Sequence, residues 1–405
     1  MTGQAQMPEK LVLHPDRSIA DQVLRLADAV LVPALRQRTP WVVDAGLFDQ
    51  AGQPVPLAQG WHSATNRATR FPPFPAQVSE RRNGRYLFLG HYHPQFGHFL
   101  LETTARLWHL HHAPDSYDGA IVLHQPGADL ARIEDMLGRF MALCGWKMPP
   151  LLKADGPLRL GQVVVPMQGC GALTLMEATP EYRAMIHDRF AADIAPKGHR
   201  KIYISRTGLD HPHGSLIEED RLEQLLQAEG FVPYHPQHHS MEDQIAQYKA
   251  AEVIAGVDGS AFHLVALVVR AHQRVVLFQR RPAPEVFLQA GQLTRFGAGQ
   301  VAVINARPMG WSPAGVRRSA LSVFGVADFP QAGRQLADLG LIADPAPWTE
   351  TPREELRSRL RAIGARLGAD MYEVQRPGES LADLPLRSHP RRIRLYPRRR
   401  WRGND

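Results

Sequence analysis

Short apolar runs of strand length alternate with amphipathic stretches of helix length, and this alternation constrains the fold more than any other feature of the chain. A first block has such runs at 86–90, 120–124 and 162–166. A second block has them at 201–205, 231–235, 252–257, 274–279 and 300–305. Strands that alternate with helices form mainly parallel sheets. We therefore predict an α/β protein with two Rossmann-like domains facing each other across a cleft, where ligands are usually held.

The chain length also favours more than one domain, because 405 residues exceed the size at which a single core stops growing. The segment APKGHR interrupts the alternation with Pro and Gly and serves as the predicted linker. The predicted parts are an N-terminal α/β domain, a second Rossmann-like domain, a set of C-terminal helices that could pack back on the first domain, and an Arg-rich tail. Their bounds are 1–195, 196–310, 311–386 and 387–405.

The basic charge of the chain is concentrated in its tail. The formal net charge is +7, but eight of the 47 basic residues are arginines between Arg387 and Arg402. Without residues 387–405, 39 basic and 39 acidic side chains remain (47 − 8 and 40 − 1). Nucleic-acid binding is therefore disfavoured for the folded body. The tail interleaves arginine with Ile, Leu, Tyr and Trp, which suits an anionic membrane surface, although a solvated tail or a nucleic-acid contact are the alternatives.

The sequence lacks the patterns of a membrane span, a secretory signal and a zinc motif, and this restricts the expected location and chemistry of the protein. No apolar run approaches the length of roughly 18 residues that spans a bilayer, and the start of the chain lacks the features of a secretory signal. We expect a cytoplasmic protein, with the tail as a peripheral membrane contact. Two isolated cysteines, Cys144 and Cys170, indicate a reduced compartment, and the histidines lack zinc-motif spacing. No metal and no tightly bound cofactor are predicted.

The stretch from 248 to 269, YKAAEVIAGVDGSAFHLVALVV, indicates a helix end, a buried strand, a glycine turn and a new helix. Asp258, Gly259 and Ser260 form the turn. Backbone N–H groups at a helix N-terminus suit a phosphate, and ligands of open α/β sheets bind at the carboxyl ends of strands. The alternative is a plain β-α turn. His263, one turn into the apolar helix, is either a ligand contact or a satisfied core histidine.

Two further candidates lie at the same predicted edge. Ser205 and Arg206 end the strand KIYIS, and the arginine fork matches phosphate oxygens. A surface ion pair is the alternative for Arg206. Gln244, on the helix that precedes the glycine turn, is either part of the same site or an ordinary polar surface residue.

The helix that follows YLFLG carries polar residues among Phe, Leu and Trp. After Gly97, the residues His98, Glu102, Arg106 and His109 fall close to one helical face. We predict that Glu102 is a general base for a hydroxyl and that His98 orients Glu102 or the substrate. The alternative is a polar stripe that keeps the helix soluble.

These pieces together resemble glycosyltransferase family 61, whose members include bacterial capsular-polysaccharide proteins and plant xylosyl- and arabinosyltransferases. The matching motifs, in order, are FGHFLLETTARLW (96–108), KIYISR (201–206), IEEDRLEQLLQAEGF (217–231) and SMEDQIAQYKAAEVIAGVDGSAFHLVAL (240–267). The resemblance implies a GT-B-like fold and inverting transfer of a hexosyl or pentosyl group from a nucleotide sugar, expected to be a UDP-sugar. It also implies that no tightly bound metal is needed.

Carried over residue by residue, the resemblance makes Glu102 the base and places Arg206 on the diphosphate. Gln244 and the 258–260 turn would line the donor site. The chain has Asp258 where the family usually has histidine, so either Asp258 bonds the ribose or base, or the donor binds differently. After the Ser-Arg strand the chain reads HPHGSLIEED instead of an arginine and an Asn-Glu pair, and His213 is a candidate substitute.

We therefore predict a glycosyltransferase of surface-polysaccharide biosynthesis, with a glycan or lipid-linked glycan as acceptor. The alternative is a non-catalytic glycan- or nucleotide-binding protein that retains the fold.

Overall fold

The computed structural model describes residues 8–36, 39, 41–209, 214–280, 285–304, 309–314 and 323–375. His213 and the Arg-rich tail lie outside these residues. The chain divides into two compact units, one of Met1–Ala195 with Phe262–Val268 and one of Pro196–Ala261 with Val269–Asp405. Each unit is built on a sheet of its own.

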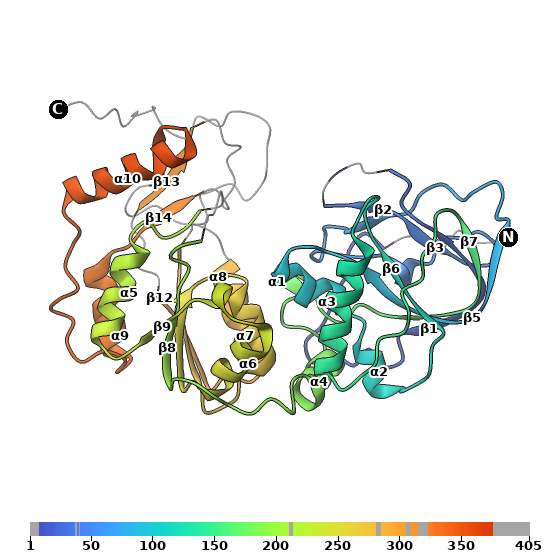
Figure 1. The fold of residues 1–405 in the computed structure, drawn as a ribbon, viewed down its shortest axis with the longest axis horizontal. Helices are drawn as coiled ribbons and strands as arrows, with labels where there is room; N and C mark the ends of the chain where they lie inside the picture. The colour runs from blue at the N-terminus through green and yellow to red at the C-terminus, as the bar shows by residue number, and fades with distance from the viewer. Residues whose placement is uncertain are drawn as a thin grey trace. The chain divides into compact units, whose positions relative to one another are not determined.

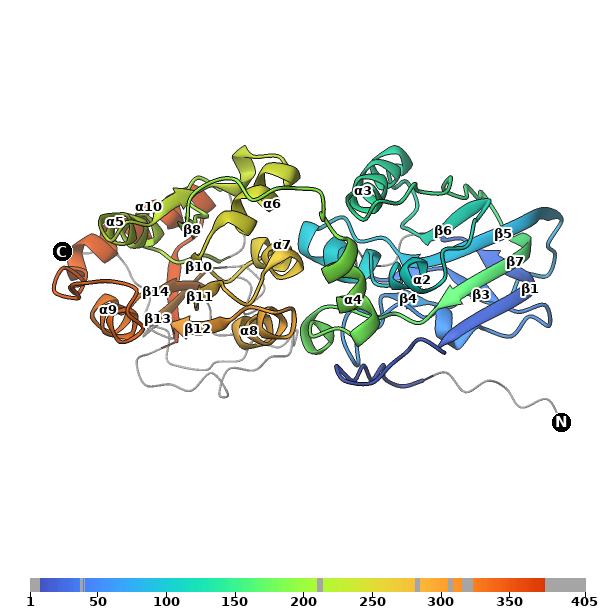
Figure 2. The ribbon, with the colours of Figure 1, turned by 90° about the horizontal axis from the view of Figure 1, so that it is seen from below.

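Five strands among the described residues form the sheet of the first unit, in the order β3-β1-β7-β5-β6. They are β1 (Val23–Val32), β3 (Gly46–Phe48), β5 (Glu80–His91), β6 (Gly119–Leu123) and β7 (Leu158–Pro166). β5 runs parallel to β6 and β7, whereas β1 is antiparallel to β7 and β3. Figure 2 shows β1, β7 and β5 side by side. The predicted mainly parallel sheet is therefore wrong for this unit, because β1 from the poorly patterned N-terminal region joins it antiparallel.

The helix predicted after YLFLG is broken into three pieces. α1 (Phe96–His98) continues into a π-helical segment (Phe99–Thr103), and α2 (Trp108–His112) follows a turn. The i+5 bond of the π-helical segment joins Thr104 N to Phe99 O at 3.4 Å. A single straight face for all four polar residues is thus ruled out, and the segment is buried rather than a solubilising stripe.

The rest of the first unit supports this sheet. Its longer helices are α3 (Leu130–Leu143) and α4 (Pro180–Arg189), and Asp129 caps α3 by accepting from Arg132 N at 3.2 Å. Shorter elements are β2 (Val43–Asp44), β4 (Thr69–Arg70) and the 3-10 turns Pro56–Ala58 and Leu173–Leu175. A core of aliphatic and aromatic side chains from β1, β3, β5, β6 and β7 holds the sheet to the loops around Val55.

Five described strands form the sheet of the second unit, in the order β12-β11-β10-β8-β9, and every neighbouring pair is parallel. They are β8 (Lys201–Ile204), β9 (Val232–Tyr234), β10 (Val253–Val257), β11 (Arg274–Phe278) and β12 (Gln300–Ile304). The α/β prediction and the five predicted strands are confirmed. Strand order reverses between β8 and β10, and ligands of doubly wound sheets bind outside the carboxyl ends at such a point.

Helices cover both faces of this sheet. α5 (Glu219–Ala228) and α9 (Phe329–Asp338) lie on one face and α6 (Met241–Ala250) and α8 (Glu285–Arg295) on the other (Figure 1). α7 (Ala261–Val268) follows β10 directly, and a 3-10 turn spans Pro236–His238. Leu222 and Leu226 of α5 share a core with Phe329 and Leu336 of α9.

The C-terminal part continues the second unit. β13 (Met309–Pro313) pairs antiparallel with β14 (Phe324–Val326) and β15 (Met371–Gln375), and α10 (Arg353–Leu367) packs on them through Leu360. The apolar faces of α9 and α10 are buried against elements of the second unit, and the packing of terminal helices on the first domain stays a prediction.

Two sequence expectations concern membranes and cysteines. No helix in the described part of the chain has the length and apolar character needed to span a bilayer. Cys144 and Cys170 are both buried free thiols.

Candidate active site

Glu102 lies at the centre of a buried cluster of histidines in the first unit. It belongs to the π-helical segment, and its side chain is fully buried, with 0% exposed. Segments of π-helix occur mainly where a functional site needs a side chain re-aimed. A carboxylate in such a place has to be compensated by hydrogen-bond donors.

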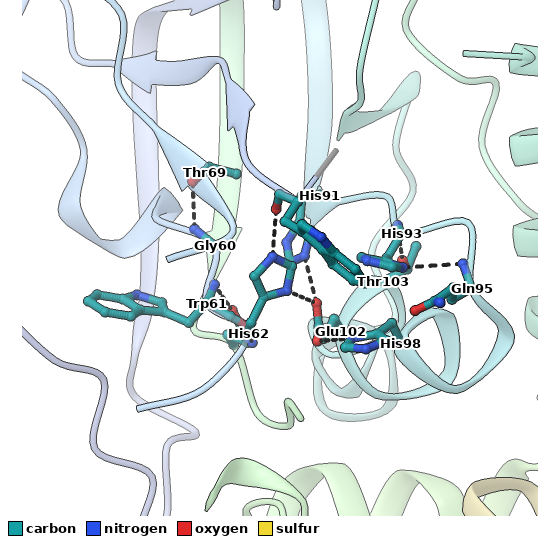
Figure 3. A network of polar contacts seen from close by, with 12 residues as sticks. Gly60, Trp61, His62, Thr69, His91, His93, Gln95, His98, Glu102 and Thr103 are labelled. Atoms are coloured by element: carbon teal, nitrogen blue, oxygen red, sulfur yellow. Dashed lines mark hydrogen bonds and ion pairs between the residues drawn. The ribbon is translucent and has the colours of Figure 1, made fainter. Parts of the chain in front are cut away.

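Three histidines supply this compensation (Figure 3). His98 Nδ1 lies 2.6 Å from Glu102 Oε1, and Glu102 Oε2 lies 2.6 Å from His62 Nδ1 and 2.9 Å from His91 Nε2. Burial alone would raise the pKa of Glu102, but the hydrogen bonds from the three rings hold it well below its usual range. Glu102 is therefore a fixed anion whose oxygens are both occupied.

His62 carries protons on both ring nitrogens. Its Nδ1 faces the Glu102 carboxylate, and its Nε2 lies 2.6 Å from the carbonyl oxygen of Trp41. Both partners accept hydrogen bonds, so both nitrogens have to donate. Burial opposes the charged ring, but the hydrogen bond and charge of Glu102 outweigh it and raise the pKa of His62. The pair is an imidazolium and a carboxylate.

His91 is the inner member of the cluster. It ends β5 and is buried, and burial lowers its pKa despite the bond to Glu102. A Cβ on Gly60 would lie only 2.7 Å from His91 Nδ1, so the absence of a side chain at Gly60 makes room for the ring. His91 therefore donates through Nε2 as a neutral imidazole.

His98 differs from the other two because 30% of its side chain is exposed. Its Nδ1 donates to Glu102, which fixes the tautomer with a lone pair on Nε2 in the neutral ring. A histidine oriented by a buried carboxylate is an arrangement suited to proton abstraction from a hydroxyl. The structure thus brings His98 and Glu102 together as predicted and presents His98 as the exposed member.

The same cluster has the ligand types of a cation site. One ring nitrogen of His62, one of His98 and a Glu102 oxygen lie within 4.8 Å of one another. The 2.6 Å separations between nitrogen and oxygen match direct hydrogen bonds. Ligand atoms on a shared zinc ion, at about 2.0–2.2 Å each, would stand about 3 Å apart or more. The separations in the structure are those of hydrogen bonds, and the same side chains supply the donor set that a cation would take.

Arg206 follows β8 at the carboxyl edge of the second sheet and is half-buried. Its backbone N donates to Glu219 Oε1 at 2.7 Å, and burial raises the pKa of Glu219 to about 7. A Cβ on Gly259 would lie 3.0 Å from Arg206 Nη1. The residues predicted after β8 and after β10 therefore meet at the point where the strand order reverses.

Asp258 is buried and bound to Arg280. Arg280 N donates to Asp258 Oδ1 at 2.9 Å, and Arg280 Nε donates to the Asp258 carbonyl at 2.7 Å and lies 3.4 Å from Oδ2. Arg280 also donates to the carbonyl of Gly214. This ion pair joins the ends of β10 and β11. The positive charge of Arg280 balances the negative charge of Asp258, which by itself would repel a phosphate.

The remaining predicted donor residues have structural partners. Gln289 brackets Gly259, accepting from its N at 3.2 Å and donating to its carbonyl at 2.8 Å, so this turn N–H is not aimed at a ligand. Gln244 donates to the carbonyls of Pro236 and His239. The set is completed by Ser205, buried with Oγ 2.8 Å from Thr207 Oγ1, Ser260, which is exposed, and His263, buried on α7.

Sequence reasoning missed His62, His91 and Arg280. His91 and Arg280 follow the ends of strands that were predicted, and polar residues at carboxyl ends of parallel strands were a usable signal. His62 lies in a loop 40 positions before Glu102, and nothing in its local sequence marks it.

Comparison with known proteins assigns a class to this arrangement. Residues 96–276, which include Glu102, Arg206 and Asp258, match the model of a family of glycosyltransferases. The matched family is glycosyltransferase family 61, and the resemblance inferred from the sequence motifs is confirmed over this stretch. No curated protein matches the chain.

Proposed function

We propose that the protein is an inverting glycosyltransferase that moves a sugar from a nucleotide-sugar donor to a glycan hydroxyl. The observation that carries this proposal is His98, whose Nδ1 is bound to a buried carboxylate while the ring is partly exposed. The family match supplies the reaction class. An inverting transfer needs a base for the acceptor hydroxyl and stabilisation of the departing diphosphate.

In this proposal the base is His98, and Glu102 orients it. The acceptor hydroxyl gives its proton to His98 Nε2 as its oxygen attacks the anomeric carbon, and the nucleoside diphosphate leaves with the electron pair of the broken bond. Glu102 stabilises the imidazolium that forms on His98. Direct proton transfer to Glu102 is disfavoured, because three histidines occupy its oxygens and its side chain is fully buried.

Arg206 is the proposed partner of the diphosphate. Its planar fork suits the oxygens that gain charge as the bond to the sugar breaks. Ser205, Gln244, Gly259 and His263 shape the surroundings, while Asp258, neutralised by Arg280, fixes the turn. Ser260, which is exposed beside this turn, is the proposed polar contact to the donor.

The finer assignments belong to the same proposal. The donor is a UDP-sugar carrying a hexosyl or pentosyl group, and the acceptor is a surface glycan or its lipid-linked precursor. The two units supply the donor and acceptor sides of a GT-B-like enzyme, without a tightly bound metal. The site of action is the cytoplasmic face of the membrane.

A panel of nucleotide sugars tests the reaction class. Incubation of the full chain with each sugar is expected to release nucleoside diphosphate, with transfer when glycan acceptors are added. EDTA is expected to leave the rate unchanged, and a loss of rate that Zn²⁺ or Mn²⁺ restores would make the histidine cluster a metal site. Nucleotide binding without turnover for every donor would favour the non-catalytic alternative.

Variants separate the roles of His98 and Glu102. His98→Ala is expected to lower kcat by about 10²–10⁴-fold, and added imidazole is expected to restore part of it. His187→Ala is the matched control, because His187 is an exposed histidine of the same unit that pairs with Asp188, and this variant should retain the rate. If imidazole fails to restore His98→Ala while formate restores Glu102→Ala, Glu102 is the base.

A further inference from the structure

Two aromatic rings pack against His98 without contacting Glu102. The Trp41 ring centre lies 5.9 Å from that of His98 and 5.3 Å from that of His93. His93 and His98 stack at 4.3 Å with an angle of 27° between their planes. The three rings form a small aromatic group that includes the candidate base, and the reaction described above uses only one of them.

Trp41 is unusual in this group because 46% of it is exposed. Its carbonyl already serves His62, but that contact needs no indole ring. A Trp side chain is a rigid, amphipathic contact surface, and leaving it in water forgoes much of its burial energy. A single exposed aromatic residue is ordinary by itself, so a second observation has to point to a ligand.

His93 supplies that observation. It is 95% buried, since its exposed fraction is 5%. Its Nδ1 accepts from Gln95 N at 3.2 Å, which puts the proton of the neutral ring on Nε2, and burial lowers its pKa to about 3, so the ring is neutral. Yet Nε2 has no hydrogen-bond partner within the part of the chain that is described. An unsatisfied buried donor destabilises the folded protein and requires an explanation.

We propose that Trp41, His93 and His98 form a subsite for a pyranose ring of the acceptor glycan, an inference that rests on the proposed function. The C–H face of the pyranose stacks on the indole of Trp41. The attacking hydroxyl donates its proton to His98 Nε2, and a neighbouring sugar oxygen accepts the N–H of His93. Because the His93 nitrogen is buried, the side chains that cover it move when the sugar enters.

This assignment explains features that core packing leaves open. A neutral sugar offers both an apolar face and oxygen acceptors, which match an exposed indole and an orphaned N–H donor. The backbone of His93 is held by Thr103 Oγ1 at 3.0 Å, so the donor is fixed in place by the same π-helical segment that carries Glu102. The cost of the unsatisfied donor is recovered when the acceptor binds.

Binding of simple sugars tests the subsite without turnover. Methyl pyranosides with glucose, galactose, mannose and N-acetylglucosamine configurations are mixed with the full chain, and saturation transfer from protein to sugar is measured by NMR. At least one is expected to receive saturation on one face of its ring. Trp41→Ala is expected to weaken that binding at least tenfold, and Trp41→Phe, which keeps a ring, is expected to retain most of it.

Phe74→Ala is the matched control. Phe74 lies in the first unit with a similar exposed fraction of 42%, but it packs against Phe48. This variant is expected to bind the sugar as the unchanged chain does. Thermal unfolding of each variant shows whether a loss of binding reflects a loss of fold.

A pair of substitutions at His93 isolates its N–H. His93→Gln places an amide donor near the position of Nε2, whereas His93→Asn keeps an acceptor near Nδ1 and removes that donor. We expect the Gln variant to bind the sugar and the Asn variant to bind it at least tenfold more weakly. If His93 has only a structural role, the Gln and Asn variants should bind the sugar equally well. Any difference between them should then appear in stability alone.

Two results would overturn the subsite: binding that is equal in the unchanged chain and Trp41→Ala, or the absence of saturation transfer to every pyranoside in the panel. Neither is confused with failure of the proposed function, which would appear as the absence of nucleoside diphosphate release from every nucleotide sugar. If the chain hydrolyses its donor and Trp41→Ala binds the sugar unchanged, the proposed function stands and only this subsite is rejected.

Discussion

At the scale of single residues, the cluster around Glu102 shows how three histidines hold a buried carboxylate as an anion. The i,i+4 spacing of His98 and Glu102 was enough to predict their contact, because it survives the change from α- to π-helix. His62 reaches the same carboxylate from a distant loop, so its role follows from tertiary structure alone. The positive charge of His62 makes Glu102 the anionic member of a buried ion pair.

The ion pair of His62 and Glu102 predicts a pH dependence of stability. The raised pKa of His62 adds stability that is complete below its unfolded value of 6.5 and is lost as pH rises through the folded value. The lowered pKa of Glu102 adds stability that is complete above its unfolded value of 4.5 and is lost as pH falls through the folded value. Both contributions are therefore complete between pH 4.5 and 6.5.

The measurement is the melting temperature of the unchanged chain and of His62→Gln across pH 3 to 9. This range extends about 1.5 pH units below the unfolded pKa of Glu102 and about 2.5 above that of His62. We expect the difference between the two to be largest between pH 4.5 and 6.5 and to shrink on either side. A difference that does not vary with pH would mean that His62 is not charged in the folded protein.

At the scale of elements, prediction succeeded where strands are continuous apolar runs and failed where pairing is distant. Every strand of the second sheet was visible because strands of parallel sheets are buried on both faces. β1 was not, since all of its first six residues are half-exposed or fully exposed before the buried end begins, and its partner β7 lies more than a hundred residues away. Helix periodicity could not reveal the π-helical segment, because one turn with an extra residue leaves little trace in sequence.

Gly60 illustrates how a loop serves the element beside it. In Gly60→Ala, the new Cβ would stand 2.7 Å from His91 Nδ1 and 3.0 Å from Thr69 Cγ2, so His91 has to move. We expect a loss of about 1–3 kcal/mol in the free energy of unfolding, together with slower glycosyl transfer as the support of Glu102 is disturbed.

Gly138→Ala in α3 provides the control. No atom lies within 4 Å of the Cβ that would be added, and alanine is favoured over glycine in a helix, so a gain of about 0.5–1 kcal/mol is expected. Equal stability of the Gly60 and Gly138 variants, measured by urea unfolding, would show that His91 tolerates the added carbon.

At the scale of the whole molecule, charge is distributed unevenly along the chain. Residues 387–405 carry all of the formal net charge of +7. The rest of the chain has equal numbers of basic and acidic side chains. A lipid-linked acceptor would reside at a membrane, and polybasic segments contribute about 1 kcal/mol per basic residue near an anionic surface. The tail is thus the proposed membrane contact of this enzyme.

Truncation after Leu386 tests this contact. The full chain is expected to bind vesicles containing phosphatidylglycerol and to release them as salt is raised, whereas the truncated chain should bind them no better than vesicles of phosphatidylcholine. Sedimentation with the vesicles measures both. Equal binding by the two chains would move the membrane contact elsewhere, and preferential binding of nucleic acid by the tail would favour the alternative partner.

The position of β7 between β1 and β5 has a consequence for synthesis on the ribosome. β1 ends at Val32, but β7, which pairs with one edge of β1, ends only at Pro166. β5 pairs with the other edge of β7. At about 5–20 residues per second, the edge of β1 stays open for on the order of ten seconds after β1 is made, and the edge of β5 stays open from its own synthesis until β7 is complete. Nascent chains of this protein therefore carry unpaired strand edges for most of the time the first unit takes to emerge, and slowing translation before residue 166 should increase their aggregation.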